Sequence, residues 1–218
     1  MTNAYEVVKM FERRVAAHFD VDHGIAVDCC TNAIFLSLQY RLHSGWTADG
    51  SACIPRHTYV SVPFAIRNCG LRVEWRDQEW KYFYSITPWR VIDAAKYWRH
   101  RDRTGRSADL SIPLEAGDHL WCLSFHYAKP IPIGRGGMIL TNDGEAAQWL
   151  RRARYDGREG KPYREEQIKM QGWHMYMTPE QAARGLALMD TYPNGIGVRE
   201  EDYPDVSKFE AFNEKPVC

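Results

Sequence analysis

The chain alternates between short apolar runs and stretches in which apolar side chains recur at helical spacing. Over residues 4–19, Tyr5, Val8, Phe11, Val15 and Phe19 recur every three or four positions, which predicts an amphipathic helix. The remaining pattern predicts, in order, strand 24–28, helix 30–42, strands 52–54 and 71–75, a strand ending at residue 93, a strand ending near residue 124, strand 138–140, helix 143–156 and a helix that opens at residues 178–181.

This order of elements predicts the fold class. Strands that alternate with helices bury apolar runs on both faces of a sheet, so we expect a three-layer α/β sandwich with a mostly parallel central sheet. A ligand site is expected at the strand ends. We assign residues 1–191 to this domain and residues 192–218 to a polar C-terminal tail, and we expect residues 77–88 to form a connection without a strand.

Composition narrows the function classes. Lys+Arg and Asp+Glu are both 28, so no net charge draws the chain to nucleic acid or to a membrane surface. No apolar run approaches the roughly 20 residues that span a bilayer, and the first residues lack the regions of a signal peptide. We therefore expect a cytoplasmic protein. The cysteines show no repeated Cys-x-x-Cys, which argues against zinc or redox work.

The stretch with the clearest chemistry is Ser124-Phe125-His126-Tyr127-Ala128-Lys129, which runs through two prolines into Gly134-Arg135-Gly136-Gly137. It predicts a buried strand, a loop that carries one lysine, and a glycine turn. Desolvation lowers the pKa of a lysine, so Lys129 could attack an aldehyde such as pyridoxal phosphate and hold it as a Schiff base. A solvated loop lysine is the competing interpretation of this segment taken alone.

A second stretch predicts an anion site. Strand 24–28 leads through a polar turn into the apolar helix, and the free N–H groups at a helix N-terminus favour a phosphate. Thr31 could alternatively only cap that helix.

Together with Thr141-Asn142-Asp143, these segments resemble the DegT/StrS family of pyridoxal-phosphate sugar aminotransferases, which have fold type I of the aspartate aminotransferase superfamily. The resemblance runs in matching order from about Phe11 to about Met189, with a middle segment and the family's C-terminal domain missing. It implies pyridoxal 5'-phosphate as cofactor and Lys129 as its covalent, catalytic residue. It also implies a phosphate site made of Cys30, Thr31, Asn32 and Ser124, where Cys30 replaces a glycine of the family.

The same resemblance assigns three further cofactor contacts. Pro55-Arg56-His57-Thr58-Tyr59 matches a segment whose aromatic ring stacks on the pyridine ring, so Tyr59 takes that role and His57 is the competing residue. Asp93 matches the aspartate that pairs with the pyridine nitrogen, although an aspartate after a strand often only caps a helix. Lys96 stands where the family has a glutamine, near the expected position of the phenolate oxygen.

The function implied is transfer of an amino group, with glutamate as the expected donor, to the keto group of a nucleotide-linked sugar. The resemblance also implies a homodimer whose active site lies close to the subunit interface. Two alternatives stay open: a pyridoxal-phosphate enzyme with a non-sugar substrate, such as a modified nucleotide or base, and a non-catalytic reduced relative. The basic run Arg99–Arg106 could hold substrate phosphates or form a solvated loop. Nucleic acid is only a secondary possibility for it.

Overall fold

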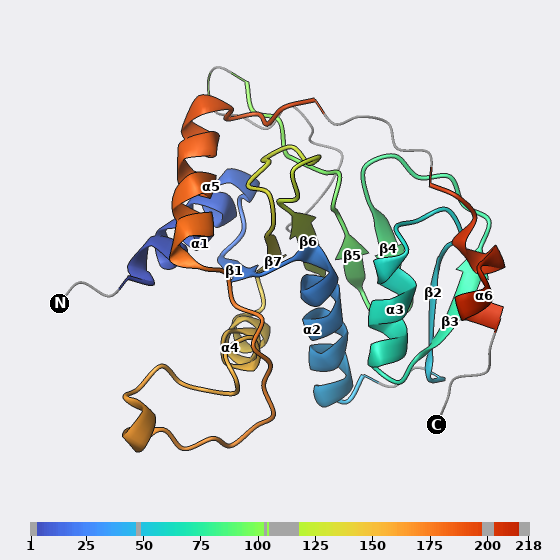
Figure 1. Ribbon diagram of the computed structural model, residues 1–218, viewed down its shortest axis with the longest axis horizontal. Coiled ribbons are helices and arrows are strands. Elements are labelled where there is room, and N and C mark those ends of the chain that lie inside the picture. The colour runs from blue at the N-terminus through green and yellow to red at the C-terminus, as the bar shows by residue number, and fades with distance from the viewer. Residues whose placement is uncertain (1–3, 47–48, 103, 105–117, 198–202, 214–218) are drawn as a thin grey trace.

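The computed structural model describes residues 4–46, 49–102, 104, 118–197 and 203–213 (Figure 1). Its elements are α1 (Glu6–Phe19), β1 (His23–Val27), α2 (Cys30–His43), β2 (Ser51–Pro55), α3 (Ser61–Asn68), β3 (Arg72–Arg76), β4 (Tyr84–Ile86), β5 (Val91–Asp93), β6 (Leu120–Ser124), β7 (Gly137–Thr141), α4 (Gly144–Ala153), η1 (Tyr163–Glu165), α5 (Pro179–Thr191), η2 (Val206–Lys208) and α6 (Glu210–Asn213).

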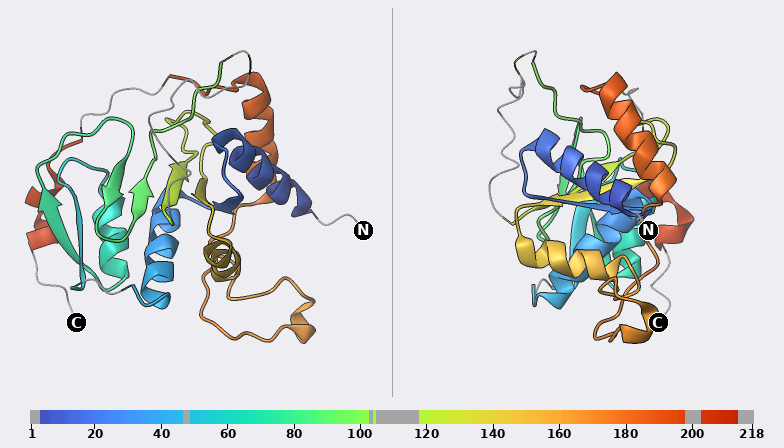
Figure 2. Two further views of the ribbon diagram at one scale, coloured as in Figure 1. Left: turned by 180° about the vertical axis from the view of Figure 1, so that it is seen from behind. Right: turned by 90° about the vertical axis from the view of Figure 1, so that its left-hand side faces the viewer.

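Two apolar cores lie on opposite faces of the central sheet, as the strand period of two requires. On β6, Cys122 packs with α2, α3 and α4, whereas its neighbours Trp121 and Leu123 pack with α1 and α5. On β7, Ile139 faces the first core and Met138 the second. The views in Figure 2 show α1 and α5 together at one end of the molecule. The predicted three-layer α/β fold is confirmed.

The sheet is mixed rather than mostly parallel. The strand order is β1-β7-β6-β5-β4, with a separate pair β2-β3. The β5-β6 and β2-β3 pairs are parallel, and the β1-β7, β6-β7 and β4-β5 pairs are antiparallel. β5 follows β4, and β7 follows β6, through connections that contain no helix. Such a connection reverses the direction of the chain, so each of these two pairs is antiparallel.

Strand β4 corrects the prediction of a strandless connection over residues 77–88. Its three residues alternate in burial, with Tyr84 and Ile86 buried on either side of the half-buried Ser85. Just beyond it, Thr87 exchanges backbone hydrogen bonds of 2.9 and 3.2 Å with Cys53 of β2, which joins the strand pair to the main sheet. A strand this short leaves too little periodicity to detect in the sequence.

The first arginines of the basic run close the C-terminal end of α1. Arg99 and Arg101 both pair with Asp20 at 2.7 Å, and Arg101 also donates to the carbonyl oxygens of Ala17 and His18. Cations are favourable at that end of the helix dipole. These two guanidinium groups are thus engaged in the fold, while Arg103 and Arg106 lie outside the described residues.

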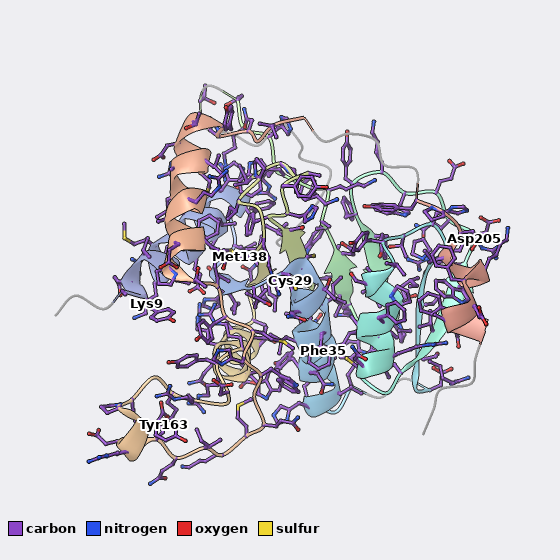
Figure 3. All side chains as sticks on the ribbon, viewed as in Figure 1. Lys9, Cys29, Phe35, Met138, Tyr163 and Asp205 are labelled. Atoms are coloured by element: carbon purple, nitrogen blue, oxygen red, sulfur yellow. The ribbon has the colours of Figure 1, made fainter. Side chains whose placement is uncertain are left out.

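Part of the predicted tail packs against the molecule. In residues 203–213, Val206 is buried and its N–H donates to the carbonyl of Arg56, and Phe212 packs on Phe64 and Trp75. Figure 3 shows Asp205 on this side of the molecule, far from Tyr163 at the tip of the loop that follows α4. The segment thus contacts Arg56 just after β2 and Trp75 of β3, and Tyr203 lies near the ends of β5 and β6, where it lines a cavity with Asp93 and Ser124.

Candidate functional site

A cavity of about 300 Å³ lies where the C-terminal ends of β5 and β6 meet the N-terminus of α2. Its volume is at the lower end of the range for small-molecule sites. Among the residues predicted for a cofactor site, those that line it are Cys30, Thr31, Tyr59, Asp93, Ser124 and Lys129. The predicted position of the site at the strand ends is therefore the position of this cavity.

Lys129 is fixed in the loop between β6 and β7 by its neighbours. Phe125 closes the base of the loop, since its N–H donates to the carbonyl of Gly136 and its carbonyl accepts from Gly134. Phe125 and Ile131 are fully buried in the core under α1 and α5. The Lys129 N–H donates to the carbonyl of His126 at 2.9 Å. Anchored on both sides, the lysine is only 7% exposed although it belongs to a loop.

Asp93 ends β5 and is 4% exposed. Its carboxylate accepts hydrogen bonds from the Tyr84 hydroxyl at 2.8 Å and from the Ala95 N–H at 3.1 Å, and Tyr84 in turn is 2.6 Å from the Thr58 hydroxyl. Burial raises the pKa of Asp93, which the hydrogen bonds and the charge of Lys129 oppose. A buried carboxylate and a buried amine thus share one cavity.

The N-terminus of α2 forms another wall. No side-chain cap hydrogen bond forms at its N-cap residue Cys29. Cys29, Cys30 and Thr31 at the start of the helix all line the cavity. The Thr31 hydroxyl is 2.7 Å from the Ser61 hydroxyl, and Ser124 at the end of β6 lines the same cavity. Burial raises the pKa of the Cys30 thiol, so Cys30 is a neutral wall residue. Hydroxyl groups and free N–H groups suit a phosphate.

Gly137 allows α2 to begin this close to the sheet. It opens β7 between Val27 of β1 and Ser124 of β6. A Cβ atom at Gly137 would lie 2.5 Å from the carbonyl carbon of Cys29 and 2.7 Å from the N atom of Cys30. Only glycine therefore permits this approach of the helix start to the strand.

Three aromatic residues form the outer wall of the cavity. Tyr59 packs edge-on against Tyr203 with a centroid distance of 6.3 Å, and Tyr203 is stacked with Trp80 at 5.9 Å. The competing residue His57 does not line the cavity, because its Nδ1 lies 2.8 Å from the carbonyl oxygen of Tyr203 on the other side of this wall.

Two predicted residues are outside the cavity. Asn32 donates to the Asp28 carboxylate at 2.7 Å, which places its amide beside the end of β1. The Lys96 ammonium lies 4.4 Å from the Tyr203 ring and 5.0 Å from the Trp80 ring, and it lines a neighbouring hollow with Asp77 and Glu79. The structure therefore separates Lys96 from the Lys129 cavity by the aromatic wall.

Sequence reasoning missed several lining residues, among them Ser61, Trp80, His126, Arg135 and Tyr203. Arg135 carried a detectable signal, since it stands between two glycines of the turn after Lys129. Trp80 and Tyr203 carried none, because they come from a connection and from the predicted tail. Within the described ranges, no cluster of three or more His, Cys, Asp or Glu could hold a metal ion, and no helix has the length and apolar character to cross a membrane.

The sequence profile of the DegT/DnrJ/EryC1/StrS aminotransferase family matches residues 1–94 and 115–207, which is well over half of the chain. Among curated proteins, GDP-perosamine synthase of Caulobacter vibrioides is 26% identical over 87% of this chain and 58% of its own length. The UDP-4-amino-4,6-dideoxy-N-acetyl-beta-L-altrosamine transaminase of Helicobacter pylori is 33% identical over 36% of this chain and 21% of its own length.

Among solved structures, the sugar aminotransferase CalS13 from Micromonospora echinospora has a similar fold, with a TM-score of 0.69 and 18% identity over 86% of this chain and 61% of its own. The chain thus spans less than two thirds of the length of these relatives.

Proposed function

Because the chain belongs to the DegT/DnrJ/EryC1/StrS aminotransferase family, we propose that it is a pyridoxal-phosphate-dependent aminotransferase in which Lys129 binds the cofactor covalently. One observation carries the proposal: the buried lysine and the buried carboxylate of Asp93 line the same cavity at the strand ends. Burying two ionisable groups is costly unless the fold or a ligand compensates, and such groups gather at functional sites.

The residues present fit the cofactor. The uncapped start of α2 with Thr31 and Ser124 offers N–H and hydroxyl groups for a phosphate, and Tyr59 offers a ring face for stacking. Asp93 supplies the carboxylate for a protonated ring nitrogen. Asn32 and Lys96 contribute from outside the cavity, Asn32 by orienting Asp28 and Lys96 by packing on the aromatic wall.

When bound, pyridoxal phosphate supplies an electron sink for a carbanion at the substrate carbon. The chain's residues do the rest. Asp93, kept in place by Tyr84 and Ala95, stabilises positive charge at the ring nitrogen. Lys129 would hold the cofactor through Nζ. Once the amino donor has displaced it, the same Nζ atom would move the proton from the substrate carbon to the cofactor carbon, first as general base and then as general acid.

The acceptor that we propose is the keto group of a nucleotide-linked sugar, with an amino acid such as glutamate as donor. Its support is the naming of two matched relatives as a GDP-perosamine synthase and a UDP-amino-sugar transaminase. Since the chain spans only part of their length, the acceptor is tested directly. Incubation with glutamate and a panel of nucleotide-linked keto sugars should give 2-oxoglutarate and an amino sugar, detected by mass spectrometry.

The cofactor assignment has a sharper test. Adding pyridoxal phosphate to the purified chain should produce a visible absorbance band, and borohydride reduction followed by peptide mapping should place the pyridoxyl group on Lys129. Lys96 and Lys161 serve as internal controls. A label on either of them with Lys129 unmodified overturns the assignment, and a chain that shows no band and takes up no label is a non-catalytic relative.

We also propose a homodimer with the cavity close to the subunit interface. Large aromatic side chains are exposed beside the cavity and on the loop after α4, including Tyr59, Tyr127 and Tyr163. Such residues are enriched at protein interfaces. Sedimentation velocity at micromolar concentration should show a dimer, and an active monomer at that concentration contradicts the proposal.

A further inference from the structure

Arg135 lines the cavity, yet the family resemblance gives it no role. Its side chain is 67% exposed and forms an ion pair of 2.7 Å with Asp28. Asp93, Lys129 and Arg135 are the only residues among Asp, Glu, Lys and Arg in the described lining of the cavity. Lys129 is buried and shares the cavity with Asp93. An anion that enters the cavity from solvent therefore meets the positive charge of Arg135 first.

The guanidinium binds Asp28 along one edge. Nη2 donates to the carboxylate of Asp28 at 2.7 Å, and Nε donates to the backbone carbonyl of Asp28 at 3.3 Å. The side chain of Cys29, which also lines the cavity, is a further hydrogen-bond partner. The edge formed by Nη1 and the second N–H of Nη2 makes neither of the two bonds to Asp28, and such an edge has the spacing that binds a carboxylate with two parallel hydrogen bonds.

Asp28 itself is held in place. Its second carboxylate oxygen accepts from the Asn32 amide at 2.7 Å, and its N–H donates to the carbonyl of Met175 at 2.9 Å. The backbone of Arg135 is also fixed, because its carbonyl accepts from the Gln181 side chain at 3.2 Å. The chain Asn32–Asp28–Arg135 thus orients the guanidinium before any ligand arrives, which lowers the entropy cost of binding.

We propose that Arg135 binds the α-carboxylate of the amino-acid donor at the mouth of the cavity, with Asp28 and Asn32 as positioning residues. This inference rests on the proposed aminotransferase function and deepens it. A donor enters the cavity from solvent in every turnover, and the Arg135 side chain is 67% exposed at the cavity lining. The hydroxyl and N–H groups at the start of α2 remain available for the cofactor phosphate.

The test measures binding rather than turnover. Glutarate, a dicarboxylate that lacks an amino group, is titrated by calorimetry into the pyridoxal-phosphate-loaded chain, and into the untreated chain if no visible band develops. Arg135→Gln should raise the glutarate Kd on the order of 10- to 100-fold, the usual effect of losing a charge-assisted hydrogen-bonded pair. The glutarate Kd of Arg135→Lys should lie between those of wild type and Arg135→Gln, because lysine keeps the positive charge but lacks the paired N–H groups of the guanidinium.

Arg14→Gln is the matched control, since Arg14 forms a comparable exposed ion pair of 2.8 Å with Asp190 outside the cavity. It should leave the glutarate Kd unchanged. Equal Kd values for wild type and Arg135→Gln, or no glutarate binding by a wild-type chain of normal melting temperature, overturn the proposal.

A second experiment distinguishes two anions that Arg135 could bind, the donor carboxylate and the cofactor phosphate. Pyridoxal phosphate and phosphate-free pyridoxal are each titrated into wild type and Arg135→Gln. The proposal expects neither affinity to change more than about twofold, well below the loss of one charged hydrogen bond. A selective loss for pyridoxal phosphate assigns Arg135 to the cofactor phosphate and overturns the donor-carboxylate assignment. Absence of the visible band in wild type defeats the proposed function separately, whatever glutarate does.

Discussion

Replacing Gly137 by alanine tests whether the contact between β7 and the start of α2 builds the anion site. The new methyl group would lie 2.5 Å from the carbonyl carbon of Cys29, whereas ordinary contact begins at 3.4 Å. The helix start must therefore withdraw by about 3.4 − 2.5 = 0.9 Å. The three nearest atoms, the carbonyl carbon and oxygen of Cys29 and the N atom of Cys30, all belong to the backbone, so no side-chain rotation can absorb the overlap.

Two magnitudes follow from this displacement. Overpacking at a well-packed position costs about 1–3 kcal/mol in the free energy of unfolding. Moving a binding wall by about 1 Å can reduce catalysis on the order of 100-fold. We therefore expect Gly137→Ala to lose both stability and affinity for pyridoxal phosphate, with a larger loss for pyridoxal phosphate than for pyridoxal, because the phosphate wall is the part that moves.

Urea unfolding and absorbance titration measure the two effects. Gly197→Ala is the matched control, because an added Cβ there meets nothing within 4 Å and its backbone has no left-handed conformation. It should be neutral in both assays. If Gly137→Ala unfolds within about 0.5 kcal/mol of wild type, the range of ordinary surface changes, and binds the cofactor equally well, the helix start is not fixed by this contact.

Three further predictions concern separate parts of the site. Lys129→Arg should abolish the visible band and turnover, because a guanidinium stays protonated, whereas Lys161→Arg should retain both in the same assays. Burial raises the pKa of Asp93 in the folded state, so the folded state binds more protons than the unfolded state, and the cofactor-free chain loses stability as pH rises through the folded pKa. Urea unfolding over a pH series should show this loss in wild type but not in Asp93→Asn. Parallel stability curves for the two proteins contradict the prediction. Phe212→Ala removes two aromatic pairs that together contribute about 1–3 kcal/mol. Hydrogen exchange in residues 203–213 should therefore accelerate, while the exchange rates of α2 stay the same. Unaltered exchange in residues 203–213 means that other contacts hold the segment.

The sequence predicted the layers and part of the site for a physical reason. Burial on both faces of a sheet leaves continuous apolar runs, and the last residues of two parallel neighbouring strands, here Asp93 and Ser124, must lie at the same edge. The assignment of Asp93, Ser124 and Lys129 to a cofactor site came from the resemblance of their segments to the DegT/StrS family, together with the desolvation argument for Lys129, and it stays a prediction.

The remaining features depend on contacts between distant segments. Lys96 packs on the ring of Tyr203, which holds it outside the cavity. No local sequence pattern predicts a contact between these two residues. Strand β4 exists because Tyr84 pairs with Asp93 of β5 rather than because of its own sequence. The engagement of Arg99 and Arg101 likewise required the position of Asp20. Side-chain partners of this kind are set by tertiary packing, so they become visible only in the structure.

The outer wall has a consequence for the order in which the protein is made. Tyr203 lies later in the chain than every other residue of the described cavity lining, the next being Gly136. A growing polypeptide emerges from the ribosome N-terminus first, so Lys129, Asp93 and Trp80 all precede Tyr203. The outer wall of the cavity is therefore the last part of its lining to be made, and it is complete only when Tyr203 packs beside Trp80.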